Sequence, residues 1–132
     1  MTPEAVQRWL NAYSHAWETY DPREIADLFA DSAEYRWHPW DQGDGVARGR
    51  QAIVDAWLSD RDPIGTYQGR YRPQLVQGND AVAVGTSHYH VDASRSRIDR
   101  EYHNLFLLKF TDAGQCVSFT EWYMRSPDTD GQ

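Results

Sequence analysis

The chain has 132 residues and a formal net charge of -7, a size that favours one domain with a hydrophobic core and is too small for two. The chain has thirteen basic and twenty acidic residues, and the absence of a Lys- or Arg-rich run argues against a nucleic-acid partner. No apolar run approaches the roughly 18 residues of a membrane span, and the first nine residues do not resemble a secretory signal. We therefore expect a cytoplasmic protein with no membrane partner, and the single cysteine, Cys116, excludes an internal disulfide.

Helical periodicity dominates the first third of the chain. An apolar stripe predicts a first helix, capped by Thr2 and Pro3, and it consists of Val6, Trp9, Leu10, Tyr13, Trp17 and Tyr20. A second helix starts at Asp21 and Pro22, with Glu24 reaching back to the cap amide and a buried face of Ile25, Leu28 and Phe29. A third helix is expected around Ile53, Ala56, Trp57 and Leu58.

Strand patterns fill the rest of the chain. A short strand is expected over 33–38, followed by a glycine-containing loop over 40–49. Four longer strands are predicted at Tyr67–Gln77, Ala81–Asp92, Ile98–Thr111 and Cys116–Arg125, and Pro73 marks the first of them as an edge or bulged strand. This order predicts an α+β fold in which three helices pack in a strongly curved, mostly antiparallel sheet. We expect one domain over 1–125 and a flexible C-terminal tail over 126–132.

Several segments together resemble the nuclear transport factor 2-like superfamily, which includes the SnoaL-like polyketide cyclases and the ketosteroid isomerases. The similar segments are the first-helix stripe, 21–25, 28–31, 49–53, 112–114 and 119–123. The resemblance implies a cone-shaped α+β barrel with an apolar pocket inside, usually assembled as a homodimer through the outer face of the sheet. It leaves the function open, because the fold hosts isomerases, dehydratases, epoxide hydrolases, cyclases and non-catalytic binding domains.

Three residues are candidates for catalysis. The resemblance places Tyr13 at the isomerase position that donates to an enolate oxygen, and His38 near the position of the catalytic base, which is a carboxylate in those isomerases. Strand parity places Glu121 on the concave face among aromatic residues, where burial raises a carboxyl pKa and favours acid/base chemistry. Structural alternatives exist for each: Tyr13 as part of the apolar stripe, His38 as a strand-end histidine, and Glu121 as the partner of Arg48, Arg50 or Arg72.

The aromatic share of 14%, with six tryptophans, predicts a pocket for a small, flat hydrophobic or aromatic molecule. Asn104 could orient a substrate oxygen, and Phe106 occupies the place of the isomerases' second acid. The predicted substrate-binding residues are Trp17, Tyr35, Trp37, Trp40, Trp57, Asn104, Phe106, Phe119 and Tyr123. His88, His90 and His103 match a metal site in residue type, but nothing in the sequence fixes their geometry, so we favour a cross-strand polar ladder and expect neither a metal nor a cofactor.

These patterns favour a cofactor-independent enzyme of the isomerase, cyclase, dehydratase or hydrolase type that uses acid/base chemistry. The alternative is a non-catalytic small-molecule-binding or accessory domain of the same fold. Leu105, Leu107, Trp122 and Met124 alternate with the inward-facing set, so the outer face of the sheet is also apolar and predicts a homodimer.

Overall fold

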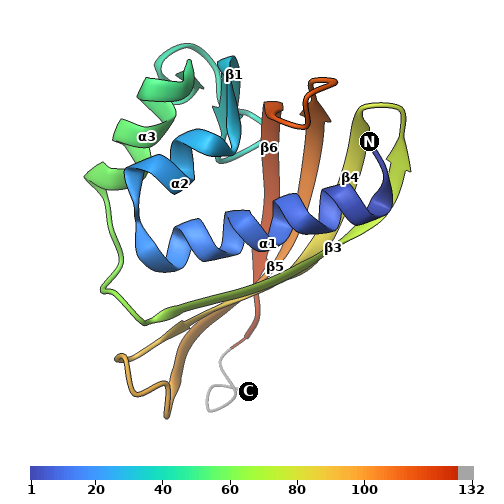
Figure 1. The fold of residues 1–132 in the computed structure, drawn as a ribbon. Helices are drawn as coiled ribbons and strands as arrows, with labels where there is room; N and C mark the ends of the chain where they lie inside the picture. The colour runs from blue at the N-terminus through green and yellow to red at the C-terminus, as the bar shows by residue number, and fades with distance from the viewer. Residues whose placement is uncertain (128–132) are drawn as a thin grey trace.

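A computed structural model describes residues 1–127 and contains three α-helices and a six-stranded sheet (Figure 1). The helices are α1 (Pro3–Thr19), α2 (Pro22–Asp27) and α3 (Arg50–Ser59), and a short 3-10 turn lies at Gly43–Gly45. The strands are β1 (Phe29–Arg36), β2 (Ala47–Arg48), β3 (Tyr67–Gln77), β4 (Asp80–His90), β5 (Ile98–Phe110) and β6 (Cys116–Arg125). The predicted α+β class is confirmed.

The first helix forms where the apolar stripe and the capping residues predict it. Thr2 accepts a hydrogen bond from the amide of Ala5, and Pro3 occupies the first turn. At its other end, Tyr20 adopts a left-handed conformation and its amide donates to Ala16. The stripe is buried except for Trp17, which is partly buried, and the indole of Trp9 donates to the carbonyl of Leu28, so α1 is fixed over the core.

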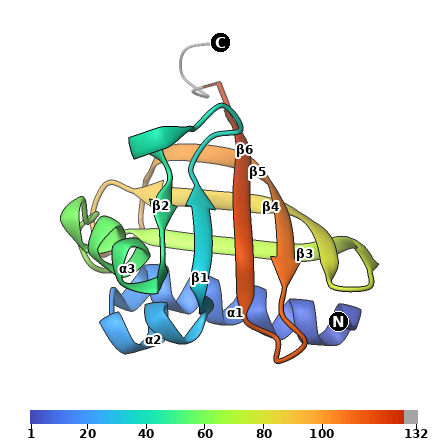
Figure 2. The ribbon, with the colours of Figure 1, turned by 90° about the horizontal axis from the view of Figure 1, so that it is seen from above.

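The sheet is open and runs in the order β2-β1-β6-β5-β4-β3, with β1 and β6 parallel and all other neighbours antiparallel (Figure 2). The predicted edge and bulge at Pro73 are both present, because β3 is an outer strand and its register shifts between Pro73 and Leu75. The pairing with β6 ends at Arg36, which lies opposite Thr120, so the last residues of β6 are not paired with β1.

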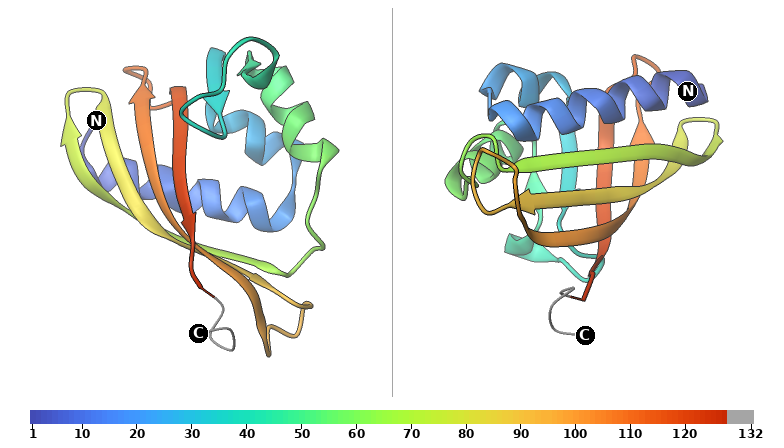
Figure 3. Two further views of the ribbon diagram at one scale, coloured as in Figure 1. Left: turned by 180° about the vertical axis from the view of Figure 1, so that it is seen from behind. Right: turned by 90° about the horizontal axis from the view of Figure 1, so that it is seen from below.

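The long strands curve strongly, and α1 crosses their concave side (Figures 1 and 3). Gly85 in β4 permits this shape, since a Cβ atom there would collide with the carbonyl of Arg70 and the Cα of Tyr71 in β3. The cone-shaped architecture is therefore confirmed, and the space between α1 and the sheet holds the candidate site.

The prediction was wrong at the second helix. Phe29 begins β1, because its backbone pairs in parallel with Cys116, and α2 ends at Asp27. Glu24 accepts from the hydroxyl of Thr19 and pairs with His15, while the amide of Asp21 donates to Thr19.

No helix among residues 1–127 is long and apolar enough to cross a membrane. In the predicted tail, the amide of Ser126 donates to the carbonyl of Glu101 and its hydroxyl donates to the Glu101 carboxylate. Residues 128–132 of this tail lie outside the described residues.

Candidate active site

A cavity of about 260 Å³ lies between α1 and the concave face of the sheet. Its lining combines aromatic rings with hydroxyl, amide and charged groups. The lining residues are Tyr13, Trp17, Tyr35, Trp37, Asp60, Asp62, Tyr67, Tyr71, Ser87, Tyr89, Arg100, Tyr102, Asn104, Glu121 and Tyr123.

Glu121 provides the cavity with a carboxyl group from β6. It lies opposite Phe106 of β5, which is buried, so register places both on the inner face. The amide nitrogen of Asn104 donates a 2.6 Å hydrogen bond to Glu121 Oε2. Burial raises the pKa of Glu121 to about 7, although the hydrogen bond from Asn104 acts in the opposite direction. This carboxyl group can therefore gain or lose a proton near neutral pH.

Two buried tyrosine hydroxyls meet in the same cavity. Tyr13 Oη of α1 lies 3.3 Å from Tyr35 Oη of β1. Burial raises the pKa of both phenols well above their usual value, and the nearby carboxylate of Glu121 adds to this effect. Both groups consequently stay protonated, and one of the two protons is available for a substrate oxygen.

A second hydroxyl pair lies on β3. Tyr67 Oη and Tyr71 Oη are 2.6 Å apart. A Cβ atom at Gly69, between them, would collide with Tyr67 Oη and lie 2.7 Å from Tyr71 Oη, so glycine makes room for the pair. Ser14 of α1 donates to the Gly69 carbonyl at 2.8 Å and holds the helix against this strand.

Charged residues lie where the cavity meets the α3–β3 loop. Arg100 pairs with Asp62 at 3.5 Å and with Asp99 at 3.3 Å, and its guanidinium lies 4.5 Å from the ring centroid of Tyr89. Arg48 and Arg50, two of the predicted partners of Glu121, pair instead with Glu34 and Asp31 at 2.7 Å each. The third, Arg72, lines the outer groove described below.

His38 lies on the rim of the cavity rather than in its lining. Its Nδ1 is 3.2 Å from Asp41 Oδ1, its Nε2 is 3.1 Å from Tyr123 Oη, and its ring stacks on Trp40. Both ring nitrogens are thus engaged, because Pro39 turns the chain and brings Asp41 back to the imidazole. The predicted base lines the outer groove and contacts the cavity lining through Tyr123.

A hollow of about 400 Å³ adjoins the cavity and shares Trp17, Trp37 and Asp60 with it. Trp57 lines this hollow and stacks on Trp17, with ring centroids 3.9 Å apart. Within residues 1–127, Trp57 Nε1 is the one buried side-chain nitrogen or oxygen that lacks a hydrogen-bond partner. A ligand oxygen or a water molecule could accept this proton.

Apart from His38, the predicted site residues fall into four groups. Seven line the cavity: Tyr13, Trp17, Tyr35, Trp37, Asn104, Glu121 and Tyr123. Phe106 and Phe119 lie behind it, fully buried against the Tyr13 ring, because the core side of α1 covers them. Trp57 lines the adjoining hollow, while Trp40 is 71% exposed on the outer side because the turn at Pro39 carries it past the sheet edge.

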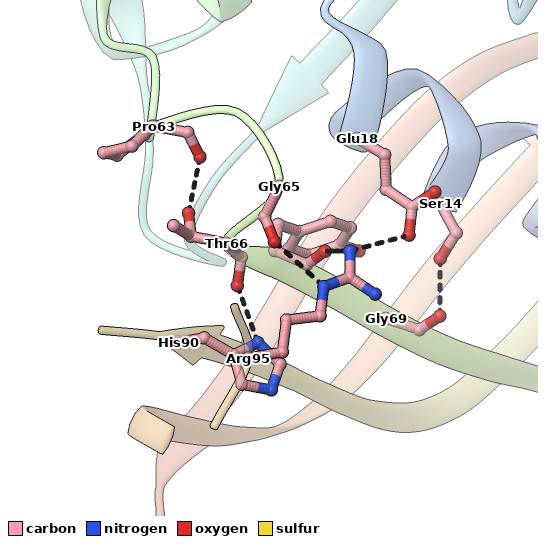
Figure 4. Close-up of polar contacts among 9 residues, drawn as sticks. Ser14, Glu18, Pro63, Gly65, Thr66, Gly69, His90 and Arg95 are labelled. Carbon is pink, nitrogen blue, oxygen red and sulfur yellow. Dashed lines mark hydrogen bonds and ion pairs between the residues drawn. The ribbon is translucent and has the colours of Figure 1, made fainter. Parts of the chain in front are cut away.

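The three candidate metal histidines do not converge. His90 Nδ1 is 2.9 Å from the carbonyl of Thr66, close to where Arg95 contacts Gly65 and Glu18 (Figure 4). His88 and His103 flank Glu101 at 2.6 and 3.3 Å. No cluster within residues 1–127 could hold a metal ion.

Sequence reasoning missed the tyrosines that complete the lining. Register aligns Tyr67 with Tyr89 and Arg100, and Gly69 with Ser87 and Tyr102, so these residues share the inner face. The alternation of Tyr67, Gly69 and Tyr71 in β3 was a usable signal, since alternate residues face one side. Asp60 and Asp62 come from a loop, whose side-chain directions no sequence period reveals.

An apolar groove of about 880 Å³ covers the outer face of the sheet. Its lining includes Val82, Val84, Leu105, Leu107, Trp122 and Met124. Asn104, Glu121 and Tyr123 line both the groove and the cavity, so the two adjoin at the unpaired end of β6.

Solved structures share this fold. An NTF-2 like protein of unknown function from Burkholderia xenovorans LB400 is 20% identical, with a TM-score of 0.67 and coverage of 96% of this chain and 88% of that one. A candidate ketosteroid isomerase from Kribbella flavida is 16% identical, with a TM-score of 0.65 and coverage of 96% and 82%. An LEH-like epoxide hydrolase from M. tuberculosis is 11% identical, with a TM-score of 0.63 and coverage of 92% and 84%.

At these identities the likeness shows the fold alone, and none of the curated proteins compared matches the chain. The family comparison is more specific, since the model of the SnoaL-like domain matches residues 6–119. The chain therefore belongs to the SnoaL-like family.

Proposed function

We propose that the protein is a cofactor-independent enzyme that transfers protons on a small ring-containing molecule. The observation that carries the proposal is Glu121, a carboxyl group with a pKa raised to about 7 inside a cavity of the size of a small organic molecule. A group that is half protonated near neutral pH serves as either a general acid or a general base.

Tyr13 is the proposed oxyanion donor. Its hydroxyl stays protonated because burial raises its pKa, and Tyr35 beside it can hold the hydroxyl in place. A buried donor of this kind stabilises a negative charge that develops on a substrate oxygen in the transition state. Glu121 then moves the proton while Tyr13 stabilises the resulting enolate or alkoxide.

The lining favours a flat substrate that carries oxygen functions. Aromatic rings supply apolar contact area, while the tyrosine hydroxyls, Ser87 and Asn104 supply hydrogen-bonding groups. The unpartnered Trp57 indole nitrogen beside the cavity adds another donor. A carbonyl- or hydroxyl-bearing ring compound combines these properties, and similar folds described as a candidate ketosteroid isomerase and an LEH-like epoxide hydrolase are consistent with such chemistry.

The alternative is a domain that binds a small molecule without converting it. In its favour, the Tyr13 and Tyr35 hydroxyls contact each other, Tyr67 and Tyr71 do the same, and His38 is held between Asp41 and Tyr123. A lining whose polar groups satisfy one another is suited to stable binding.

Turnover of a generic carbon acid separates the two functions. The probe is 5-nitro-1,2-benzisoxazole, a flat molecule whose C3 proton is removed by a base as its N–O bond breaks, which releases a coloured phenolate. We expect Glu121→Gln to lower the rate roughly a hundredfold, because an amide cannot accept the proton. Glu101→Gln, which removes a carboxylate outside the cavity, is the matched control and should retain the wild-type rate.

Binding of the unreactive product analogue 4-nitrophenol should survive Glu121→Gln, which shows that the cavity is intact. A rate no higher than the uncatalysed reaction in both the wild type and Glu121→Gln, with 4-nitrophenol bound by both, would favour the binding domain.

A further inference from the structure

A row of hydrogen bonds from Asp41 through His38 to Tyr123 crosses the open edge of β6. The backbone of β1 leaves β6 after Arg36, opposite Thr120, so the segment that contains Glu121 and Tyr123 has no strand beside it on that side. The loop after β1 arches toward this end of β6 (Figure 2). His38, in this loop, bridges the gap by its contact with Tyr123.

Asp41, His38 and Tyr123 follow one another as carboxylate, imidazole and hydroxyl, which is the order of groups that activates a nucleophile or base. Asp41 contacts the imidazole at Nδ1 (3.2 Å) and also accepts from the amide of His38 (3.0 Å), which fixes the carboxylate against the loop. The carboxylate accepts a hydrogen bond from Nδ1–H, and this tautomer leaves a lone pair on Nε2. That lone pair lies 3.1 Å from Tyr123 Oη and can accept the phenolic proton.

Tyr123 connects this row to the cavity. It lines the cavity together with Glu121, and the two residues share one face of β6 at a separation of two residues, about 7 Å along the strand. The ring of Tyr102 holds the Tyr123 ring edge to face, with centroids 5.4 Å apart. His38, whose side chain is 32% exposed, can return a proton to solvent.

We propose that Tyr123 is a second proton-transfer residue of the site, a general base whose own proton passes to His38, with His38 and Asp41 as positioning residues. The step balances as follows: a substrate X–H bond breaks, its proton binds Tyr123 Oη, and the Tyr123 proton binds His38 Nε2. The imidazolium is stabilised by Asp41, and Glu121 in its protonated form delivers a proton to another substrate atom.

The inference rests on the proposed function and narrows it. An acid and a base whose Cα atoms lie about 7 Å apart along one strand suit a reaction that removes a proton at one substrate atom and adds one at another. Relocation of a double bond and loss of water from a ring alcohol belong to this class. In the second case, the electron pair of the broken C–H bond forms the new C=C bond, and the leaving hydroxide takes the proton of Glu121.

Nitrogen-15 NMR of the His38 ring tests the relay without a substrate. In the neutral imidazole we expect the Nδ1–H tautomer, because only this form leaves Nε2 free to accept from Tyr123. Tyr123→Phe and Asp41→Ala should each raise the population of the Nε2–H tautomer several-fold. Tyr102→Phe, which removes a cavity-lining hydroxyl but no contact to His38, should leave the population unchanged. A predominant Nε2–H tautomer in the wild type would overturn the relay, since His38 would then donate to Tyr123.

Turnover of 5-nitro-1,2-benzisoxazole supplies the functional readout. Asp41→Asn keeps an acceptor for Nδ1–H, so the Nδ1–H tautomer should persist. The rate measured in a Glu121→Gln background should nevertheless fall about tenfold, because the charge that stabilises the imidazolium is lost. Failure of the wild type to convert the probe contradicts the proposed function, whereas the tautomer decides the relay independently. The Nδ1–H tautomer with an undiminished rate in Asp41→Asn would reject the catalytic role of Tyr123.

Discussion

The Asn104 side-chain N–H donates a hydrogen bond to Glu121, and the 2.6 Å contact orients the carboxyl group in the cavity. The Asn104 carbonyl oxygen accepts from the hydroxyl of Ser87 at 3.0 Å, which directs the amide nitrogen toward Glu121. Donation to Glu121 favours its ionised form, whereas burial favours the protonated form. The opposition of these effects places the pKa of Glu121 in the range where acid/base chemistry is effective.

The stability of the protein should depend on pH through Glu121. The pKa of this group is about 7 in the folded state and about 4.5 when unperturbed, so the folded state binds more protons between these values. Its contribution is fully present below pH 4.5 and is lost as pH rises through 7, up to about 3 kcal/mol. Urea unfolding over this range should show a decline in the wild type that is absent in Glu121→Gln. Parallel pH profiles of the unfolding free energy in the two proteins would contradict this contribution of Glu121.

The Tyr13–Tyr35 hydroxyl contact should show energetic coupling. Either Tyr→Phe change leaves a buried hydroxyl without its neighbour and should cost about 1–2 kcal/mol of unfolding free energy. The double change should cost less than the sum of the single changes, because no hydroxyl is then left unpaired. Denaturant unfolding of the wild type, the two single variants and the double variant measures the coupling. Strictly additive costs would show that the contact contributes no coupling energy.

Arg95 should hold the β4–β5 hairpin against the start of β3. Its guanidinium donates to the carbonyls of Gly65 (2.9 Å) and Tyr67 (3.0 Å) and lies 3.6 Å from Glu18 (Figure 4). Arg95→Ala should lower the unfolding free energy by about 1 kcal/mol, given the partial exposure of these contacts. Hydrogen exchange should accelerate at the amide of His90, which bonds to Thr66. Arg97→Ala, in the same loop, serves as the control, and equal effects of the two changes would remove the specific role of Arg95.

We propose that the outer face of the sheet forms a homodimer. Leu107 and Trp122 both line the apolar groove and are 40% and 42% exposed, and burial of such a surface is favourable. Leu107→Asp should convert the dimer into a monomer in sedimentation experiments. Leu75 is 64% exposed and lies on edge strand β3 outside the groove lining, so Leu75→Asp should leave the dimer intact. A monomeric wild type at micromolar concentration would be incompatible with the dimer.

Local patterns predicted most of the fold. The turn residues that flank β3 and β6 defined both strands at their observed bounds, and the stripe of α1 predicted its buried face. The prediction was wrong at Phe29 because its spacing from Ile25 and Leu28 also fits a helix. Its strand state depends on parallel pairing with Cys116, 87 residues away along the chain.

The candidate site was predictable where strand parity decides direction. Parity places Glu121 in the cavity and, once the hairpin registers are known, also Tyr89 and Tyr102. The contacts of His38 could not be predicted from strand parity. The turn at Pro39 brings Asp41 to the imidazole, and the end of the β1–β6 pairing lets His38 reach Tyr123.

The most direct test of the account is the titration of Glu121 followed by carboxyl carbon-13 NMR in the wild-type protein. The Glu121 resonance should titrate with a midpoint near pH 7, while the exposed Glu34 carboxyl, whose pKa is lowered by Arg48, should titrate below its ordinary range. A Glu121 midpoint below 5 would mean that the carboxyl group is ionised and solvated at neutral pH, and it would contradict the assignment of Glu121 as the acid/base group of the cavity.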